Sequence, residues 1–483
     1  MFNYASYLEF YSNNQIDSWV YFWHSEIQDK RVNNSLQKVK IQLAIKMMLL
    51  RSCKNIKYLD IFESETYSNS LPYPFTKISS SGIDNTNNIE NINNIDNTSN
   101  IDNFENSNNP NNPNNPNSIN NIDIYKIYNI NNILLSLNLS KLDFLLHSSK
   151  DIKTINKFVI KLSDQCKKIL YMNVLVSGKV FPLELRDSLV KLIDSQIKLK
   201  EFGLRFLYRN HLTQPHIINL ESHANTLKQL QLVDIDFTGF SFKNLKVLRN
   251  LEVLSIHYCL GFFEEEKRYY RSSEKIFPKL QKLELIKNHK AIDQKFIYIK
   301  LDSLKTLIYI NNHENEFIKR VVPIVSHNCP NLITLCCLIV EIEITSEISK
   351  LQHLQQLQLG GATYFPEDLL ILVENLPRSL IILNLLHIYS YDHIRFNDFI
   401  KKCNIQLKVL LLPFEIKLNL LIELKNYIKK FKCLKDIKIT RIYEPDIDDK
   451  EMLDLFNEEG IKYTTRNLRS VLELKETFEN FLN

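Results

Sequence analysis

The chain has 483 residues, of which 44% are hydrophobic and 24% are charged, and its formal net charge is +5. This apolar share is ample for a buried core, and so mild a charge argues against nucleic-acid binding, which needs a strong local basic stripe. No apolar run reaches the roughly 18 residues that cross a bilayer, and residues 1–10 lack the pattern of a secretory signal, so we expect no membrane partner.

The first 52 residues are expected to form a helical N-terminal cap. Residues 36–50 (LQKVKIQLAIKMMLL) are apolar on most sides, which is typical of a buried helix. Residues 53–82 contain the apolar triplet Ile56, Leu59 and Ile61, and we predict that they form a first, degenerate repeat.

Residues 83–132 are expected to form a disordered insert rich in Asn. Asn occupies 18 of the 40 positions between residues 81 and 120, and Pro110, Pro113 and Pro116 recur at a three-residue step. Such a segment cannot bury enough apolar surface to offset its chain entropy. A tolerated loop insertion is the favoured interpretation, and a regulatory role is the alternative.

Residues 133–440 carry apolar triplets with the spacing L-x-x-L-x-L. In FPKLQKLELIKN the triplet is Leu280, Leu283 and Leu285, and Asn288 follows three residues later. This spacing is the strand half of a leucine-rich repeat, in which the leucines enter a shared core. One copy is weak evidence, so the prediction depends on the number of copies.

Ten such triplets follow one another, with their first residues 22 to 29 positions apart. The steps match the length of a leucine-rich repeat. A weaker copy begins upstream at Ile169. The turn position after the triplet is filled by Asn288, Asn312 and Cys259 in three repeats and by unrelated residues in others, so we expect uneven turns. The ten triplets begin at Leu199, Leu227, Leu251, Leu280, Leu304, Leu332, Leu354, Leu380, Leu407 and Leu434.

Between triplets the apolar spacing changes from that of a strand to that of a helix, as in residues 316–327, 366–374 and 419–431. Strands and helices that alternate in this way predict an α/β leucine-rich-repeat solenoid, with a curved parallel sheet inside and helices outside. Residues 441–483 are predicted to form a C-terminal cap that includes two short helices.

Motifs that carry catalysis or hold cofactors are missing from the sequence. Only eight Gly are present, and neither a phosphate-binding loop, nor G-x-S-x-G, nor H-E-x-x-H occurs. The eight Cys follow no disulfide or zinc pattern, so we interpret them as reduced thiols in or near the core. We therefore predict a non-enzyme without cofactor or metal, located in the cytoplasm and/or the nucleus.

The inner face of the sheet is the remaining candidate surface, because strand side chains alternate and the residues that flank the leucines point away from the core. A protein substrate or peptide is the expected occupant of this concave face. The candidate contact residues are Gln229, Gln231, Ser255, His257, Lys282, Glu284, Ile308, Gln356, Gln358, Ile382, Asn384, Leu411 and Lys438.

Two features of this surface leave alternatives open. Apolar residues of the later repeats, among them Ile308, Ile310 and Leu411, form either an exposed stripe for a partner or a strip that the C-terminal tail covers. Four lysines cluster at the last repeat, at positions 429, 430, 432 and 435. A solvated helix-and-turn face is the favoured interpretation of these lysines, over a phosphate-binding patch.

Several phrases resemble the repeats of fungal F-box and leucine-rich-repeat proteins. They are SQIKLKEFGL (195–204), SHANTLKQLQL (222–232), NCPNLITL (328–335) and KKCNIQLKVLLL (401–412). FNYASYLEF (2–10) resembles the segment that follows the F-box in that family, and SCKNIKYLDI (52–61) resembles the first repeat. The resemblance implies that the repeats hold a substrate of a cullin-based (SCF-type) ubiquitin ligase and that an F-box docks on a Skp1-type adaptor.

No F-box-like segment lies ahead of Phe2 in this chain. Two explanations are open: the F-box lies upstream of Met1, or it has been lost. We therefore expect a non-catalytic protein-recognition module that resembles the substrate-binding part of an F-box protein, and the alternative is a stand-alone leucine-rich-repeat scaffold without a ubiquitin-ligase link.

Overall fold

The structure is a computed structural model that describes part of the chain. It divides into two compact units, Met1–Tyr208 and Arg209–Asn483, and each is described by itself. The described residues are 10–12, 58–61, 139–147, 152–177, 182–207, 220–238, 240–261, 276–311, 315–338, 345–361, 366–388, 393–412, 418–440 and 456–466.

Unit 1 consists of parallel strands that pair in chain order, with helices between the later ones. Its described elements are β1 (Phe10–Ser12), β2 (Tyr58–Ile61), β3 (Lys141–His147), α4 (Ile152–Gln165), β4 (Tyr171–Ser177), α5 (Leu183–Asp194) and β5 (Glu201–Phe206). The weaker triplets predicted around Ile56 and Ile169 thus fall on strands β2 and β4.

Unit 2 repeats the same alternation, and each of its strands pairs in parallel with the next one along the chain. Its first described elements are η5 (Glu221–His223), β6 (Gln229–Val233), α6 (Lys243–Lys246), β7 (Val253–His257), β8 (Lys282–Ile286), α7 (Lys290–Ile297), β9 (Thr306–Ile310), α8 (Asn315–Asn328) and β10 (Thr334–Leu338). They are followed by α9 (Thr345–Ile348), β11 (Gln356–Gly361), α10 (Pro366–Asn375), β12 (Ile382–Ile388), α11 (His393–Lys402), β13 (Val409–Leu412), α12 (Leu418–Phe431), β14 (Asp436–Thr440) and β15 (Lys462–Arg466).

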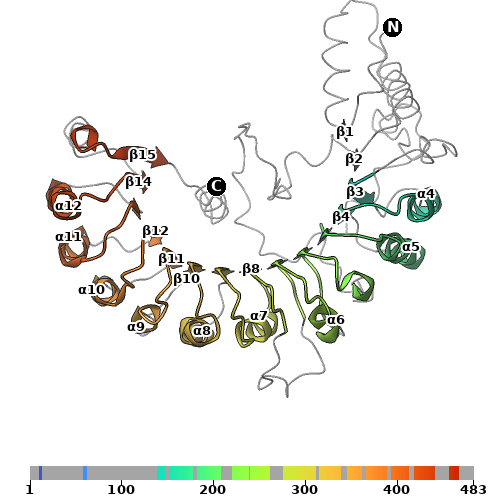
Figure 1. Ribbon diagram of the computed structural model, residues 1–483, viewed down its shortest axis with the longest axis horizontal. Helices are drawn as coiled ribbons and strands as arrows, with labels where there is room; N and C mark the ends of the chain where they lie inside the picture. The colour runs from blue at the N-terminus through green and yellow to red at the C-terminus, as the bar shows by residue number, and fades with distance from the viewer. Residues whose placement is uncertain are drawn as a thin grey trace, which may run out of the picture. The chain divides into compact units, whose positions relative to one another are not determined.

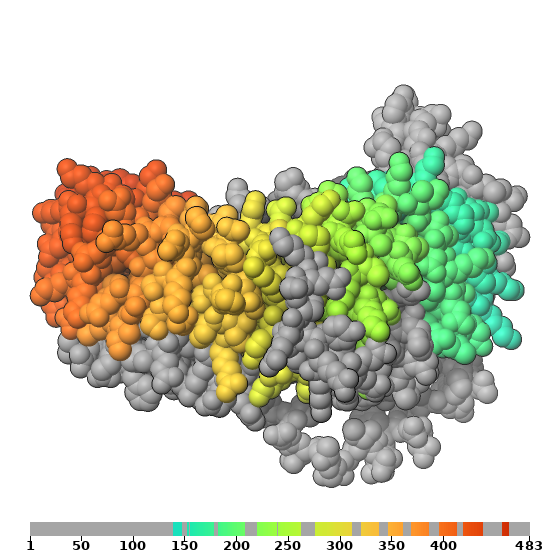
Figure 2. All heavy atoms as spheres, turned by 60° about the horizontal axis from the view of Figure 1, so that its bottom comes forward, coloured from blue at the N-terminus to red at the C-terminus, as the bar shows by residue number. Residues whose placement is uncertain are grey.

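The helices of unit 2 lie on the outer side of an arc, and its strands line the inner side (Figure 1). Seen from the helix side, the repeats from yellow to red form a continuous layer of side chains (Figure 2). Helices α8, α10 and α12 match the segments that the sequence predicted as helical to within one residue at each end. The predicted leucine-rich-repeat solenoid, with the sheet inside and helices outside, is therefore confirmed.

The core lies between the strands and the helices and is built from the triplets. Every member of the ten triplets whose side chain is described is 6% exposed or less, and most are fully buried. A further triplet, not predicted from the sequence, begins just before β3: Leu139, Leu142 and Phe144 are 2%, 0% and 0% exposed. The spine of apolar side chains in unit 1 is therefore longer than the sequence indicated.

Strands also occur where the sequence predicted caps. β1 lies within residues 1–52 and pairs with β2, and β15 lies within 441–483 and pairs with β14. The helix expected at residues 36–50, the Asn-rich insert and residues 467–483 of the predicted C-terminal cap lie outside the described residues. The domain boundaries given above therefore stay predictions.

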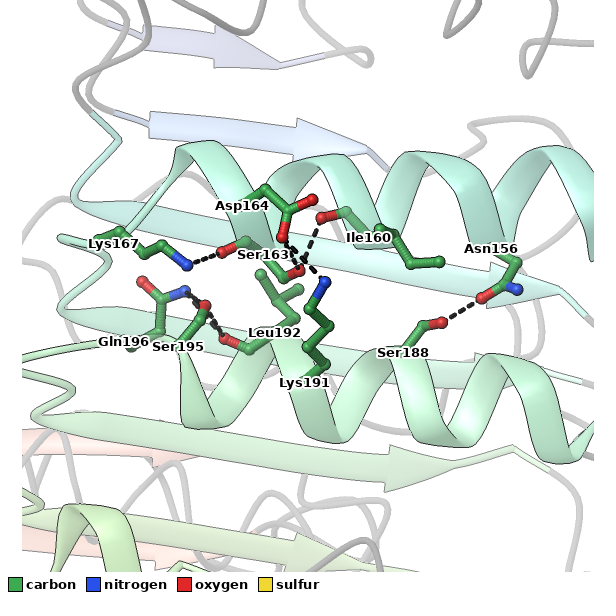
Figure 3. A network of polar contacts seen from close by, with 10 residues as sticks. All are labelled: Asn156, Ile160, Ser163, Asp164, Lys167, Ser188, Lys191, Leu192, Ser195 and Gln196. Atoms are coloured by element: carbon green, nitrogen blue, oxygen red, sulfur yellow. Dashed lines mark hydrogen bonds and ion pairs between the residues drawn. The ribbon is translucent and has the colours of Figure 1, made fainter.

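A buried glutamine ties neighbouring repeats of unit 1 together, and Figure 3 shows its contact with Leu192 beside the contacts between α4 and α5. Gln196 is 3% exposed and follows α5. Its Nε2 donates to the carbonyls of Cys166 and Leu192, both at 2.8 Å, and its Oε1 accepts the N–H of Ile169 at 3.0 Å. One side chain thereby satisfies backbone groups where α4 ends, where α5 ends and where the chain enters β4.

A buried asparagine has the corresponding role at the other edge of the strands in unit 2. Asn288 follows β8, is 3% exposed, and accepts the backbone N–H of Cys259 at 3.0 Å. Its Nδ2 donates to the carbonyl of Ile256 at 2.8 Å and to Oδ1 of Asp293 at 3.1 Å. Asn288 therefore bonds backbone groups at the turn that follows its triplet.

Asn311 continues this network into the next repeat. Its Nδ2 donates to the carbonyl of Asn288 at 2.8 Å and also to Oδ2 of Asp293. The sequence placed Asn312 at this turn, but that residue lies outside the described part of the chain. The fully buried Asp293, in the first turn of α7, thus links the turns after β8 and β9.

Replacing Asn288 by Ala should lower the free energy of unfolding by about 2 to 4 kcal/mol, because three buried polar partners lose a hydrogen bond. The matched control is Asn331→Ala. Asn331 is exposed and donates one bond, to the carbonyl of Asp302 at 2.9 Å. Urea unfolding of both variants measures the difference, and equal shifts of the two midpoints would show that the buried network does not stabilise the turns.

Candidate partner-binding surface

The strand register gathers the sequence-predicted contact residues of unit 2 into adjacent rows on the inner face. Eight of the thirteen lie on one central row, which crosses β6 to β14 with one residue on each strand. The central row is Gln231, Ser255, Glu284, Ile308, Cys336, Gln358, Asn384, Leu411 and Lys438. Gln229, Lys282, Gln356 and Ile382 lie on the row before it, and His257 lies two residues after Ser255 on β7. Whether these residues contact a partner stays a prediction.

Much of this inner face is closed to solvent. Glu284, Gln358 and Asn384 are each 2% exposed, and Ile308 and Leu411 are each 1% exposed. Ser255 and His257 are also buried, and the side chain of Lys438 lies outside the described part of the structure. The half-buried candidates are Gln229, Gln231, Lys282, Gln356 and Ile382. An apolar stripe open to solvent is therefore not present at Ile308, Ile310 and Leu411, which are 1%, 2% and 1% exposed.

A polar cluster occupies the inner face of β7 and β8. Oε2 of Glu284 lies 3.0 Å from Nε2 of His257, and its Oε1 lies 3.0 Å from Nζ of Lys282. Both oxygens of this buried carboxylate therefore have a cationic or hydrogen-bonding partner, which is what a buried charge requires. The arrangement explains how a Glu can occupy the central row of a closed inner face.

An apolar cluster adjoins the polar one. Ile286, Ile308, Ile310 and Cys336 pack together, with Tyr258 against them. Burial raises the pKa of the Cys336 thiol to about 12, and the nearby charge of Glu284 adds to the effect. Cys336 is therefore a neutral, apolar member of the inner face at physiological pH and not a nucleophile.

The open surface of this unit lies beside the inner face, along the edge where the strands begin. The residue just before each strand donates its backbone N–H to the carbonyl of the equivalent residue one repeat earlier. Four such bonds, each with an N···O distance of 2.8 Å, link Glu252, Gln281, Lys305, Ile333 and Gln355 in turn. We call these five residues the edge row; Gln281, Lys305 and Gln355 are exposed.

The edge row forms one wall of a groove with a volume of about 690 Å³. Loop residues of the same repeats, among them Lys279, Asp302 and His353, form the rest of the lining. The loops are tied to one another: Oγ of Ser303 donates to the carbonyl of Pro278 at 2.6 Å, and Nζ of Lys279 donates to Oδ1 of Asn250 at 2.6 Å. The groove therefore has a floor that is fixed from repeat to repeat.

The chemistry of the groove is polar and balanced in charge. Among the lining residues, two carboxylates, Glu252 and Asp302, stand against two lysines, Lys279 and Lys305. Exposed Gln281 and Gln355 offer both donors and acceptors. Five strands spaced at about 4.8 Å give a groove about 20 Å long, the length of roughly six extended residues. Such a groove suits an extended peptide segment whose backbone needs hydrogen-bond partners.

Sequence reasoning missed this groove because it considered only strand positions that point away from the core. A signal was present in the sequence. The residue directly after the first leucine of each triplet forms the edge row, and it is Glu, Gln or Lys at positions 252, 281, 305 and 355. A recurrent polar residue next to an invariably buried one indicates a repeated exposed edge.

The described residues contain neither a candidate metal site nor a helix that could cross a membrane. No group of three or more His, Cys, Asp or Glu side chains in that part of the chain is arranged to hold a metal ion. None of the helices placed there combines the length and the apolar character needed to cross a bilayer.

Comparisons with known proteins place few constraints on this chain. No family model matches it, and no curated protein matches its sequence significantly. A crystal structure of the Rad7 and Elc1 complex in yeast is 14% identical with a TM-score of 0.35, over 68% of this chain and 82% of that chain. A crystal structure of a protein from Bacteroides fragilis is 13% identical with a TM-score of 0.29, over 59% of this chain and 71% of that chain. At such TM-scores the solenoid fold rests on the strand pairing of the chain itself.

Six of the seven described cysteines are buried, and only Cys433 is half-buried. Burial raises the pKa of Cys166 to about 11 and that of Cys329 to about 12, so both stay protonated at neutral pH. Among the described cysteines, iodoacetamide at pH 8 should therefore modify Cys433 first in the native chain, with Cys336 reacting only after unfolding. Peptide mass spectrometry with a urea-unfolded control measures this order, and equal native rates for Cys336 and Cys433 would contradict the buried inner face.

Proposed function

We propose that this chain is a non-catalytic module that recognises another protein by binding an extended segment of it along the edge-row groove. The observation that carries the proposal is the groove itself, which is polar, balanced in charge and continuous over five repeats. A single metabolite would need convergent groups from a few positions, whereas this surface presents a polar side chain at four of its five strands.

The more specific proposal is that the module selects proteins for ubiquitination. Its support is the resemblance of phrases such as NCPNLITL (328–335) to the repeats of fungal F-box and leucine-rich-repeat proteins. In that family a Skp1-type adaptor joins the receptor to a cullin. The alternative is a scaffold that binds a partner through the same groove and has no link to a ligase.

Reversing two charges in the groove should remove most of the bound partner. Lys279 and Lys305 are exposed, so Lys279→Glu with Lys305→Glu leaves the core unchanged while placing two carboxylates where the partner would lie. We expect a loss of roughly tenfold or more in recovered partner, measured by quantitative mass spectrometry of proteins captured on the immobilised full chain.

The matched control is Lys153→Glu with Lys157→Glu, which makes the same change of charge at exposed positions on α4. If both double variants lose captured proteins equally, the groove is not the binding surface. Recovery of Skp1 and a cullin with the unmodified chain would support the ligase receptor, and a captured partner without either protein would favour the scaffold.

A further inference from the structure

A second charged surface lies on the same edge of unit 2, at its last repeats. Lys401 is near the end of α11 and Lys429 is near the end of α12, while Lys408 and Lys435 directly precede β13 and β14. Lys432 lies between Lys429 and Lys435. We call these five residues the lysine edge, and all of them are exposed.

Backbone and side-chain contacts hold the two repeats of the lysine edge together. The N–H of Lys435 donates to the carbonyl of Lys408 at 2.8 Å, so these two lysines stand on neighbouring rungs about 4.8 Å apart. The hydroxyl of Tyr427, on α12, accepts the N–H of Leu407 at 2.9 Å, and Sγ of Cys433 donates to the carbonyl of Leu407 at 3.2 Å. The backbone positions of Lys408 and Lys435 are therefore fixed relative to one another.

The members of the lysine edge make no ion pair with any residue in the described part of the chain. Two adjacent lysines differ: Lys402 pairs with Glu374 at 3.1 Å, and Lys430 donates to Asn404 at 2.7 Å. The partial negative charge at a helix C-terminus accounts for lysines near the ends of α11 and α12. It does not account for Lys408 and Lys435, which belong to the strand edge.

The backbone at Lys432 provides an independent observation. Its φ is +50°, in the left-handed region that Gly or Asn usually fills after a helix, and its N–H donates to the carbonyl of Ile428 at 2.7 Å. A lysine there costs about 1 kcal/mol of backbone strain relative to Gly. The chain thus keeps a charged side chain at a position where stability alone favours Gly.

Acidic residues border the lysine edge on both sides. Glu374, in the repeat before it, is paired with Lys402 at 3.1 Å. Exposed Glu458 and Glu459 lie a few residues before β15, whose first residue, the exposed Lys462, donates its N–H to the carbonyl of Lys435 at 2.9 Å. A long polyanion that ran along this edge would meet these carboxylates. A short acidic segment needs only to place its carboxylates against Lys408 and Lys435, which stand on neighbouring strands.

We propose that the lysine edge binds an acidic peptide segment of the partner protein. This inference rests on the proposed function, since it assumes that the chain binds a protein, and it adds a chemical property of that protein. The edge-row groove and the lysine edge lie on the same strand edge of unit 2, so one extended partner can contact both.

The test uses the full chain and a fluorescein-labelled peptide of alternating Glu and Ser, with the Gln-for-Glu peptide as the neutral control. Fluorescence anisotropy should show binding of the Glu peptide that weakens as salt is raised, and weaker or no binding of the Gln peptide. Lys408→Gln with Lys435→Gln should weaken binding roughly fivefold to tenfold.

Two further variants test whether a loss of binding comes from the lost charge or from a change in folding. Lys153→Gln with Lys157→Gln removes the same charge from α4 and should leave the affinity unchanged. Lys432→Gly should weaken binding without lowering the thermal midpoint, because it removes a charge and relieves the backbone.

The proposal is overturned if the Glu and Gln peptides bind alike or if the α4 variant weakens binding as much as the edge variant. Tighter binding of a single-stranded RNA or of phosphatidylserine vesicles than of the Glu peptide would also overturn it. Loss of captured proteins in the groove variant, together with any of these results, would leave the proposed function standing and remove only the acidic segment.

Discussion

The structure depends on one constraint, which is that no repeat can bury its apolar triplet by itself. Burying three large aliphatic side chains contributes on the order of 6 kcal/mol, whereas ordering the backbone costs about 1 to 2 kcal/mol for each residue. A repeat of 22 to 29 residues is therefore stable only between neighbours that share its core and its strand hydrogen bonds. The fully buried leucines at positions 254, 283 and 307, on successive strands, are the visible result.

This constraint explains which parts of the fold were predictable. Leucine spacing located the strands because any slip of one residue would expose the whole row. The triplet Leu139, Leu142 and Phe144, which begins just before β3, was not predicted, although its pattern is regular and its side chains are buried. β15 could not be found in this way, because Thr465 stands where the neighbouring strand β14 carries the apolar Ile439. Within the described residues β15 pairs only with β14, and a strand with one neighbour needs fewer apolar side chains.

The surface was less predictable than the core, for a physical reason. Strand alternation says which way Ile308 points but not whether water reaches it, because burial on an inner face depends on everything packed over it. The groove also depends on how the loops of successive repeats contact one another, as in the hydrogen bond from Ser303 to the carbonyl of Pro278. The spacing of apolar residues does not encode such contacts. The turns were more predictable than the surface and less predictable than the core. Asn288 was identified from its position, whereas Asn311 makes the equivalent hydrogen bonds one residue earlier than the repeat pattern indicated.

The most direct test of the stacked-repeat account is amide hydrogen exchange at the edge row. Lys305 and Gln355 have exposed side chains, yet their backbone N–H groups donate to the preceding repeat at 2.8 Å. The account predicts that both amides exchange many orders of magnitude more slowly than unstructured ones, together with the amides of β9 and β11. Exchange of these amides at the rate of an unstructured peptide would show that the repeats do not stack strand on strand, and would contradict the account.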